Sequence, residues 1–81
     1  MTGCVIGVNG YTQTGTAGIL IAVSGAITNN LVNANNTGIL TTSQFPIGYG
    51  SNTFISNYVA DVSGPLLVSM KNNVSSGGTL F

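Results

Sequence analysis

The sequence has no histidine, glutamate, arginine or tryptophan, and it has one cysteine (Cys4), one aspartate (Asp61) and one lysine (Lys71). Acid–base catalysis at neutral pH needs a histidine, or a carboxylate or lysine tuned by a partner. A serine, threonine or cysteine nucleophile needs an activating base, and no histidine can supply one. The sequence therefore predicts that the protein is not an enzyme and has no catalytic residues.

The same scarcity limits what the chain can bind. A lone cysteine forms no intramolecular disulfide, and neither histidine nor glutamate is present to complete a zinc site. Nucleic-acid binding needs several basic side chains, and only Lys71 is present. The glycines at 3–10 and 48–50 match neither a P-loop nor a dinucleotide fingerprint. We therefore expect no metal, cofactor, nucleic acid or small-molecule substrate.

Long apolar runs are also missing. The longest, 17–27, is broken by Gly18, Ser24 and Gly25, and a helical membrane span needs about 20 apolar residues. No basic segment followed by an apolar core opens the sequence, so no signal peptide is visible. We expect no membrane insertion, and a location in a virion or outside the cell.

Neutral polar residues take the place of charge. Serine, threonine, asparagine, glutamine and glycine supply 42 of the 81 residues, whereas charged residues make up 2%, against a typical ~25%. A net charge of zero favours self-association because copies do not repel one another. A chain of this size forms one domain, 1–81, with a small core, and such domains commonly need partners for stability.

The apolar residues of the first third predict strands. Asn9-Gly10 predicts a two-residue hairpin joining strands 4–8 and 11–14, with Val8 opposite Tyr11. The run 17–27 predicts a central strand buried on both faces.

The rest of the chain alternates between loops and strands. Five asparagines predict a loop over 28–37. Beyond it we expect strands at 38–42, 66–71 and 79–81. Between the first two of these we expect an aromatic loop at 44–50, in which Pro46 removes a backbone donor.

The segment 52–62 fits two structures. Its apolar residues fall at helical spacing, with Asn52 as a possible N-cap and Gly64-Pro65 as a stop, which allows a short helix over 52–63. It also alternates with period two and consists of poor helix formers, which favours a strand. The apolar residues that create the ambiguity are Phe54, Ile55, Tyr58, Val59 and Val62.

The composition as a whole predicts an all-β fold, because valine, isoleucine and threonine clearly outnumber the good helix formers. About six short strands separated by turns are typical of a small antiparallel sandwich or barrel. We find no internal repeat of the length that solenoids use, which argues against that architecture.

Aromatic residues are the remaining candidates for recognition. The segment 45–49 combines rigid aromatics with proline and glycine, as interface anchors do, although the same residues could cover the domain's own core. The expected interface residues are Tyr11, Phe45, Ile47, Tyr49 and Phe81. Asn35 and Asn73 also match the N-glycosylation pattern, which such a composition produces by chance.

These features predict a structural subunit of a multi-copy assembly, whose partners are copies of itself, a major shell protein, or both. The foremost candidate is a virion decoration or minor capsid (cement) protein. A subunit of an extracellular filament, built by strand addition, is the first alternative. A carbohydrate-binding module that uses the aromatic loop is the second.

Overall fold

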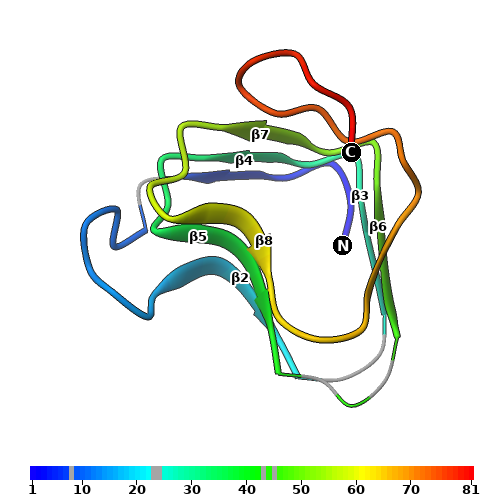
Figure 1. Cartoon of the computed structure of the whole chain (residues 1–81), viewed down its shortest axis with the longest axis horizontal. Helices are drawn as coiled ribbons and strands as arrows, with labels where there is room; N and C mark the ends of the chain where they lie inside the picture. Colours follow the sequence, from blue (N-terminus) through cyan, green and yellow to red (C-terminus); the bar gives the residue numbers. More distant parts are fainter. Residues whose placement is uncertain (8, 23–24, 43, 45) are drawn as a thin grey trace.

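The computed structural model describes residues 1–7, 9–22, 25–42, 44 and 46–81, and the chain winds through them as a parallel β-helix. Nine short strands form three parallel sheets, and these residues contain no helix. In Figure 1 the coil is seen nearly end-on, with the sheets as three walls around a shared interior. We call one turn of the coil a rung.

Each wall takes one strand from every rung. The first wall contains β1 (Val5–Gly7), β4 (Leu31–Asn33) and β7 (Thr53–Ile55). The second contains β2 (Ala17–Ile21), β5 (Thr37–Thr41) and β8 (Ala60–Ser63). The third contains β3 (Gly25–Thr28), β6 (Ile47–Gly50) and β9 (Leu67–Ser69).

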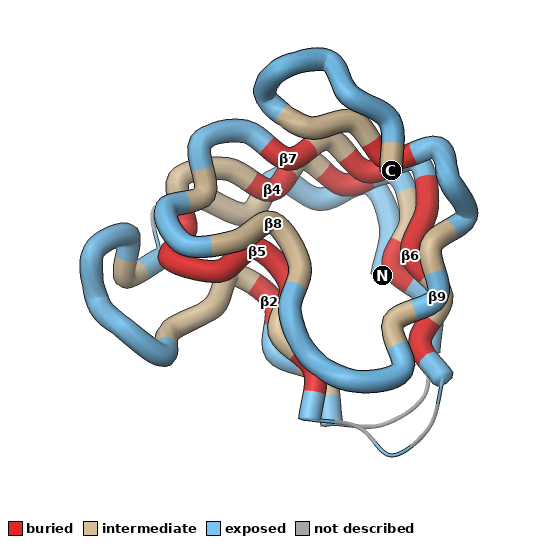
Figure 2. The backbone as a smooth tube through the Cα atoms, viewed as in Figure 1, coloured by how far each residue is buried: buried red, intermediate tan, exposed pale blue. Residues whose placement is uncertain are grey.

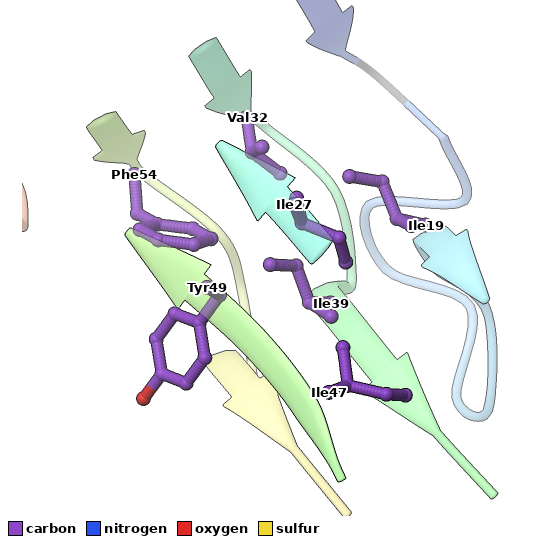
Figure 3. Close-up of a cluster of buried hydrophobic side chains, with 7 residues drawn as sticks. All are labelled: Ile19, Ile27, Val32, Ile39, Ile47, Tyr49 and Phe54. Atoms are coloured by element: carbon purple, nitrogen blue, oxygen red, sulfur yellow. The ribbon is translucent and has the colours of Figure 1, made fainter. Parts of the chain in front are cut away.

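The interior is filled by apolar side chains stacked at matching registers. Val32 lies between Ile6 and Phe54 in the first wall, and Ile39 lies between Ile19 and Val62 in the second. Figure 3 shows side chains from all three walls meeting in this core. The middle rung is the most buried because it has a neighbour on each side, as the red segments of β5 and β6 in Figure 2 show.

Two corners of the coil hold stacked asparagines. We call Asn30, Asn52 and Asn73 the first ladder, and Asn9, Asn35 and Asn57 the second. The residue before a ladder position commonly has a left-handed backbone, which turns the chain sharply and which glycine and asparagine adopt with least strain. The φ angles lie between 54° and 56° at Asn29, Ala34, Ser51 and Ser56.

The all-β expectation is confirmed, but the predicted arrangement is wrong. Strands pair in parallel, not antiparallel, and there are nine in the described residues where about six were expected. The molecule is a solenoid, although we found no repeat in the sequence. The physical reason is that each short strand pairs with the strand three places along the chain, so no antiparallel sandwich or barrel forms.

The predictions for the first half of the chain fail for the same reason. No hairpin forms at Asn9-Gly10, because β1 pairs with the distant β4; Val8 itself lies outside the described residues. The segment 17–27 is divided between two walls as β2 and β3, and β2 is an edge strand, not a central one. The expected loop at 28–37 contains β4, and the aromatic loop contains β6.

The strand alternative for 52–62 is confirmed over the helix. The segment holds β7 and β8, which lie in different walls with a corner between them. That corner explains why one amphipathic pattern fitted poorly: Phe54 faces the interior from the first wall and Val62 from the second.

The remaining strand predictions fare unevenly. Strands at 38–42 and 66–71 are present as β5 and β9, with slightly shifted bounds. The strand expected at 79–81 is reduced to a single bridge at Leu80. Residues 11–14 form turns where a strand was expected, because the hairpin that would have paired them is absent.

Candidate interaction surfaces

The five residues expected at an interface lie in different surroundings. Ile47 is fully buried and Tyr49 is 6% exposed, so both belong to the core. Phe81 is half-buried, with its ring centroid 5.5 Å from that of Phe54 and 6.4 Å from that of Tyr49. Tyr11 is exposed, and Phe45 lies outside the described residues. The four described residues are therefore not gathered on one exposed surface.

An aromatic pair does lie on the outside of the coil. Tyr11 contacts Tyr58 edge to face, with ring centroids 5.2 Å apart and ring planes at 64°. Tyr58 and the neighbouring Val59 are both exposed. Rings at this angle do not form the flat platform on which a sugar stacks, so the pair is better suited to packing against an apolar partner.

The ladder asparagines were missed by the sequence reasoning, although they are the best-connected polar side chains of the described structure. The Oδ1 of Asn52 accepts hydrogen bonds from the backbone N and the Nδ2 of Asn30, at 3.0 and 3.1 Å. Its Nδ2 donates to Ile27 O and to Asn73 Oδ1, at 2.9 and 3.0 Å. Every polar atom of that amide side chain therefore has a partner, which is how a buried amide is made compatible with a core.

The signal for the ladders was present in the sequence. Asn52 lies 22 residues after Asn30 and 21 residues before Asn73. Asn35 and Asn57 are also 22 residues apart. In the first rung the repeat is hidden, because Cys4 stands where the first ladder has asparagine and only its backbone N donates to Asn30 Oδ1, 26 residues away.

The ladders also bear on the two glycosylation motifs. The side chains of Asn35 and Asn73 are fully buried, and the Nδ2 of each donates within the core, to Ile6 O at 3.2 Å and to Tyr49 O at 3.2 Å. Attaching a glycan to either nitrogen would break these hydrogen bonds and force the asparagine side chain out of the interior of the coil. In this fold both motifs serve as ladder positions.

The last rung closes both ladders with groups of its own. Asn57 Nδ2 has no further asparagine to donate to, and it donates instead to Asp61 Oδ1 at 3.0 Å. Asn73 Nδ2 donates to Phe81 O at 3.0 Å, while the backbones of these two residues exchange hydrogen bonds at 3.1 and 2.9 Å. Val74 bridges both Thr53 of β7 and, in antiparallel, Leu80, so the end of the chain turns back over the edge of β7.

The first rung has no such closure in the described structure. β1 and β2 are the outermost strands of their walls at this end, as β8 and β9 are at the other end, and each of these four strands pairs on one side only. Only the third wall is extended at this end, where Thr2 bridges Thr28 and the amino group of Met1 donates to Ala26 O at 2.8 Å. The rung has no charged side chain, whereas Asp61 and Lys71 both belong to the last rung. The two ends of the coil therefore differ in chemistry.

The described residues contain no group of three or more histidine, cysteine, aspartate or glutamate side chains that could hold a metal. No pocket is found in this part of the molecule. Nor does the described part of the chain include a helix long and apolar enough to span a membrane.

Comparison of the chain with protein-family models, with curated proteins and with solved structures finds no match.

Proposed function

We propose that the protein is a non-enzymatic structural subunit of a multi-copy assembly, in which β-strand edges and neutral side chains pack against neighbouring copies or a shell protein. A virion decoration protein is the form we favour, and a filament subunit is the alternative. The observation that carries the proposal is the first rung, which has two open strand edges and no charged side chain in the described structure.

The physical argument is that open edges attract further strands. Soluble proteins usually block such edges with charge, proline or a covering segment, because unpaired backbone groups recruit other chains. In the last rung the turn that ends at Phe81 covers β7, and β8 carries the charge of Asp61, whereas β9 pairs with β6 alone and has Lys71 just beyond its end. The described residues offer no comparable protection to β1 and β2, which supports a role in which a partner covers these edges.

The carbohydrate-binding alternative has less support. It relied on the aromatic loop, and Tyr49 of that loop is buried. The exposed pair Tyr11 and Tyr58 would have to take its place, and its edge-to-face geometry offers one ring face at most. We keep glycan binding as an outcome that the experiment must be able to detect.

The test combines light scattering, electron microscopy and a glycan array on the purified chain. We expect association that grows with protein concentration and no retention by glycans. Growing polymers would favour the filament form, and discrete oligomers the decoration form. A protein that stays monomeric at all concentrations and binds a glycan would overturn the proposal.

A further inference from the structure

We propose that two copies associate through their first rungs, with β2 of one copy paired antiparallel to β2 of the other across a two-fold axis at Leu20. This inference rests on the proposed function and names the surface that a second copy would occupy. It is drawn from the open edge, from the side chains of the strand and from the difference between the two ends.

The open edge of β2 is long enough to pair. β2 spans five residues, as many as any strand of the described structure, and it bonds to β5 on one side only. Proline and charged residues are both absent from it. Short apolar strands of this kind, without charge or proline, are those that pair with other chains when their edge is exposed.

The side chains of β2 are self-complementary. Ile19-Leu20-Ile21 reads the same in both directions, so antiparallel pairing centred on Leu20 places leucine opposite leucine and isoleucine opposite isoleucine. Ile19 is buried in the core and Ile21 packs partly against it. Ile19 of one copy would therefore contact Ile21 of the other where the two interiors meet. Leu20 is 65% exposed on the outer face, where the two leucines would contact each other.

The charge distribution favours an interface between two first rungs over one that includes the last rung. Head-to-tail stacking would place the charged last rung, with its antiparallel turn, against the first rung of the next copy. An unpaired charge buried at an interface is costly. Two first rungs meet without any charged side chain, and the amino group of Met1 lies on the third wall, where Ala26 O already accepts its hydrogen bond. A two-fold interface of this kind is the commonest in soluble oligomers.

The area available indicates a weak dimer. The coil measures 28 × 25 Å across its longer axes, so two end faces would together bury on the order of 1,000 Å². Specific interfaces commonly bury about 1,200 to 2,000 Å². We therefore expect a dimer that forms at micromolar to millimolar concentration, and the measurement has to reach that range.

Analytical ultracentrifugation from about 10 μM to 1 mM tests the inference, the range following from this area. We expect the wild-type protein to pass from monomer to dimer. Leu20→Lys should weaken the dimer at least tenfold, because it places two like charges directly opposite each other. Val68→Lys is the matched control, since Val68 is 54% exposed and lies on β9, the edge strand at the other end of the third wall. It should dimerise like the wild type.

A second variant keeps the test independent of any effect of lysine on folding. In a Cys4→Ser background, Leu20→Cys should form a covalent dimer on mild oxidation, because opposite residues of an antiparallel pair lie close enough for a disulfide. Val68→Cys in the same background should stay reduced.

A wild-type protein that is monomeric throughout would overturn the inference, as would dissociation by Val68→Lys instead of Leu20→Lys, or failure of the Leu20→Cys cross-link. If the wild type associates and Leu20→Lys associates equally, this surface is wrong while the proposed function stands. If the wild type is monomeric and also binds a glycan, both fail.

Discussion

At the scale of single residues, the fold depends on amides that are buried and fully hydrogen-bonded. Asparagine suits a ladder because its side chain carries both a donor and an acceptor, so identical residues in successive rungs can bond to one another. Asn30, Asn52 and Asn73 use this property over three rungs. The last position of each ladder needs a different acceptor, which is a carboxylate at Asp61 and a backbone carbonyl at Phe81.

Replacing the central ladder residue should be severe. Asn52→Ala removes the acceptor of the buried Asn30 backbone N and the side-chain hydrogen bonds to Ile27 O and Asn73 Oδ1; an unpaired buried donor alone costs roughly 1–3 kcal/mol, and the other lost bonds add to it. We expect the free energy of unfolding, measured with urea, to fall by ~3 kcal/mol or more.

Asn72→Ala is the control for this change. Asn72 is exposed and its side chain bonds only at the surface, to Ser51. Its loss should lower the free energy of unfolding by less than ~1 kcal/mol. Equal unfolding midpoints for the two variants would contradict the role given to the ladder.

Adding a side chain at a glycine that lies against a ladder should also destabilise the chain. A Cβ added at Gly18 would lie 2.8 Å from Cγ and Nδ2 of Asn35, closer than carbon atoms approach in real structures. Gly18→Ala should therefore destabilise the chain by roughly 1–3 kcal/mol.

Gly25→Ala is the matched control, because nothing lies within 4 Å of its added Cβ. This change should leave stability unchanged or raise it by up to ~1 kcal/mol, since it restricts the unfolded chain. Thermal unfolding of both variants checks the pair, and a Gly18→Ala protein as stable as the wild type would show that the corner can give way.

The residue scale also shows why the ladders were not predicted. The asparagines at 28–37 predict a loop, because asparagine commonly occupies turns. Some of them do occupy turns here, as Asn29 does with φ of 56°, whereas Asn33 lies in β4. The neighbouring Asn30 is buried, and only a partner 22 residues away explains that. The preference of asparagine for turns therefore accounts for the backbone of Asn29, but it does not predict that Asn30 stacks in the first ladder.

At the scale of strands, composition predicted the type of element and missed its pairing. Valine, isoleucine and threonine favour strands in parallel and antiparallel sheets alike. The hairpin signal at Asn9-Gly10 is local, whereas the real partner of β1 begins at Leu31. The repeat is also short of identities: Gly-Ile-Leu recurs at 18–20 and 38–40, and the third rung has Asp61-Val62-Ser63 in its place. The repeat in the sequence is therefore recognisable only once it is known which strands pair.

The closing turn at the end of the chain should stabilise the last rung through Phe81. Its ring is half-buried and packs on Phe54 and Tyr49. Because a half-buried ring loses less on truncation than a fully buried one, Phe81→Ala should lower the free energy of unfolding by ~2 kcal/mol. Hydrogen exchange should show protection falling first in β7, the strand that the turn covers.

Leu80→Ala is the control for the closing turn, because Leu80 is largely exposed. Its truncation should lower the free energy of unfolding by less than ~0.5 kcal/mol. A Phe81→Ala protein with unchanged exchange in β7 would argue that the turn is not a cap.

At the scale of the whole molecule, few groups can link folding to pH. The only charged side chains at neutral pH are those of Asp61 and Lys71. Stability depends on pH only through groups that bind protons differently in the folded and unfolded states. We therefore expect the unfolding midpoint to change little between pH 3 and pH 9, as measured by thermal melts in a series of buffers. A large acid-induced transition would contradict this expectation.

The corner segments of the coil can also differ in length from rung to rung without changing the register of the stacked strands. The ladder positions at the two ends of the first wall are five positions apart in the sequence, as Asn30 and Asn35 are, and Asn52 and Asn57. At the next corner the chain takes eight residues to pass from Asn9 to Ala17, and two to pass from Asn35 to Thr37. In Figure 1 the longer segment loops away from the wall. Insertions at that corner can therefore change the outer contour while leaving the stacked interior alone, which gives evolution, or a protein engineer, a place to display new peptide on an unchanged scaffold.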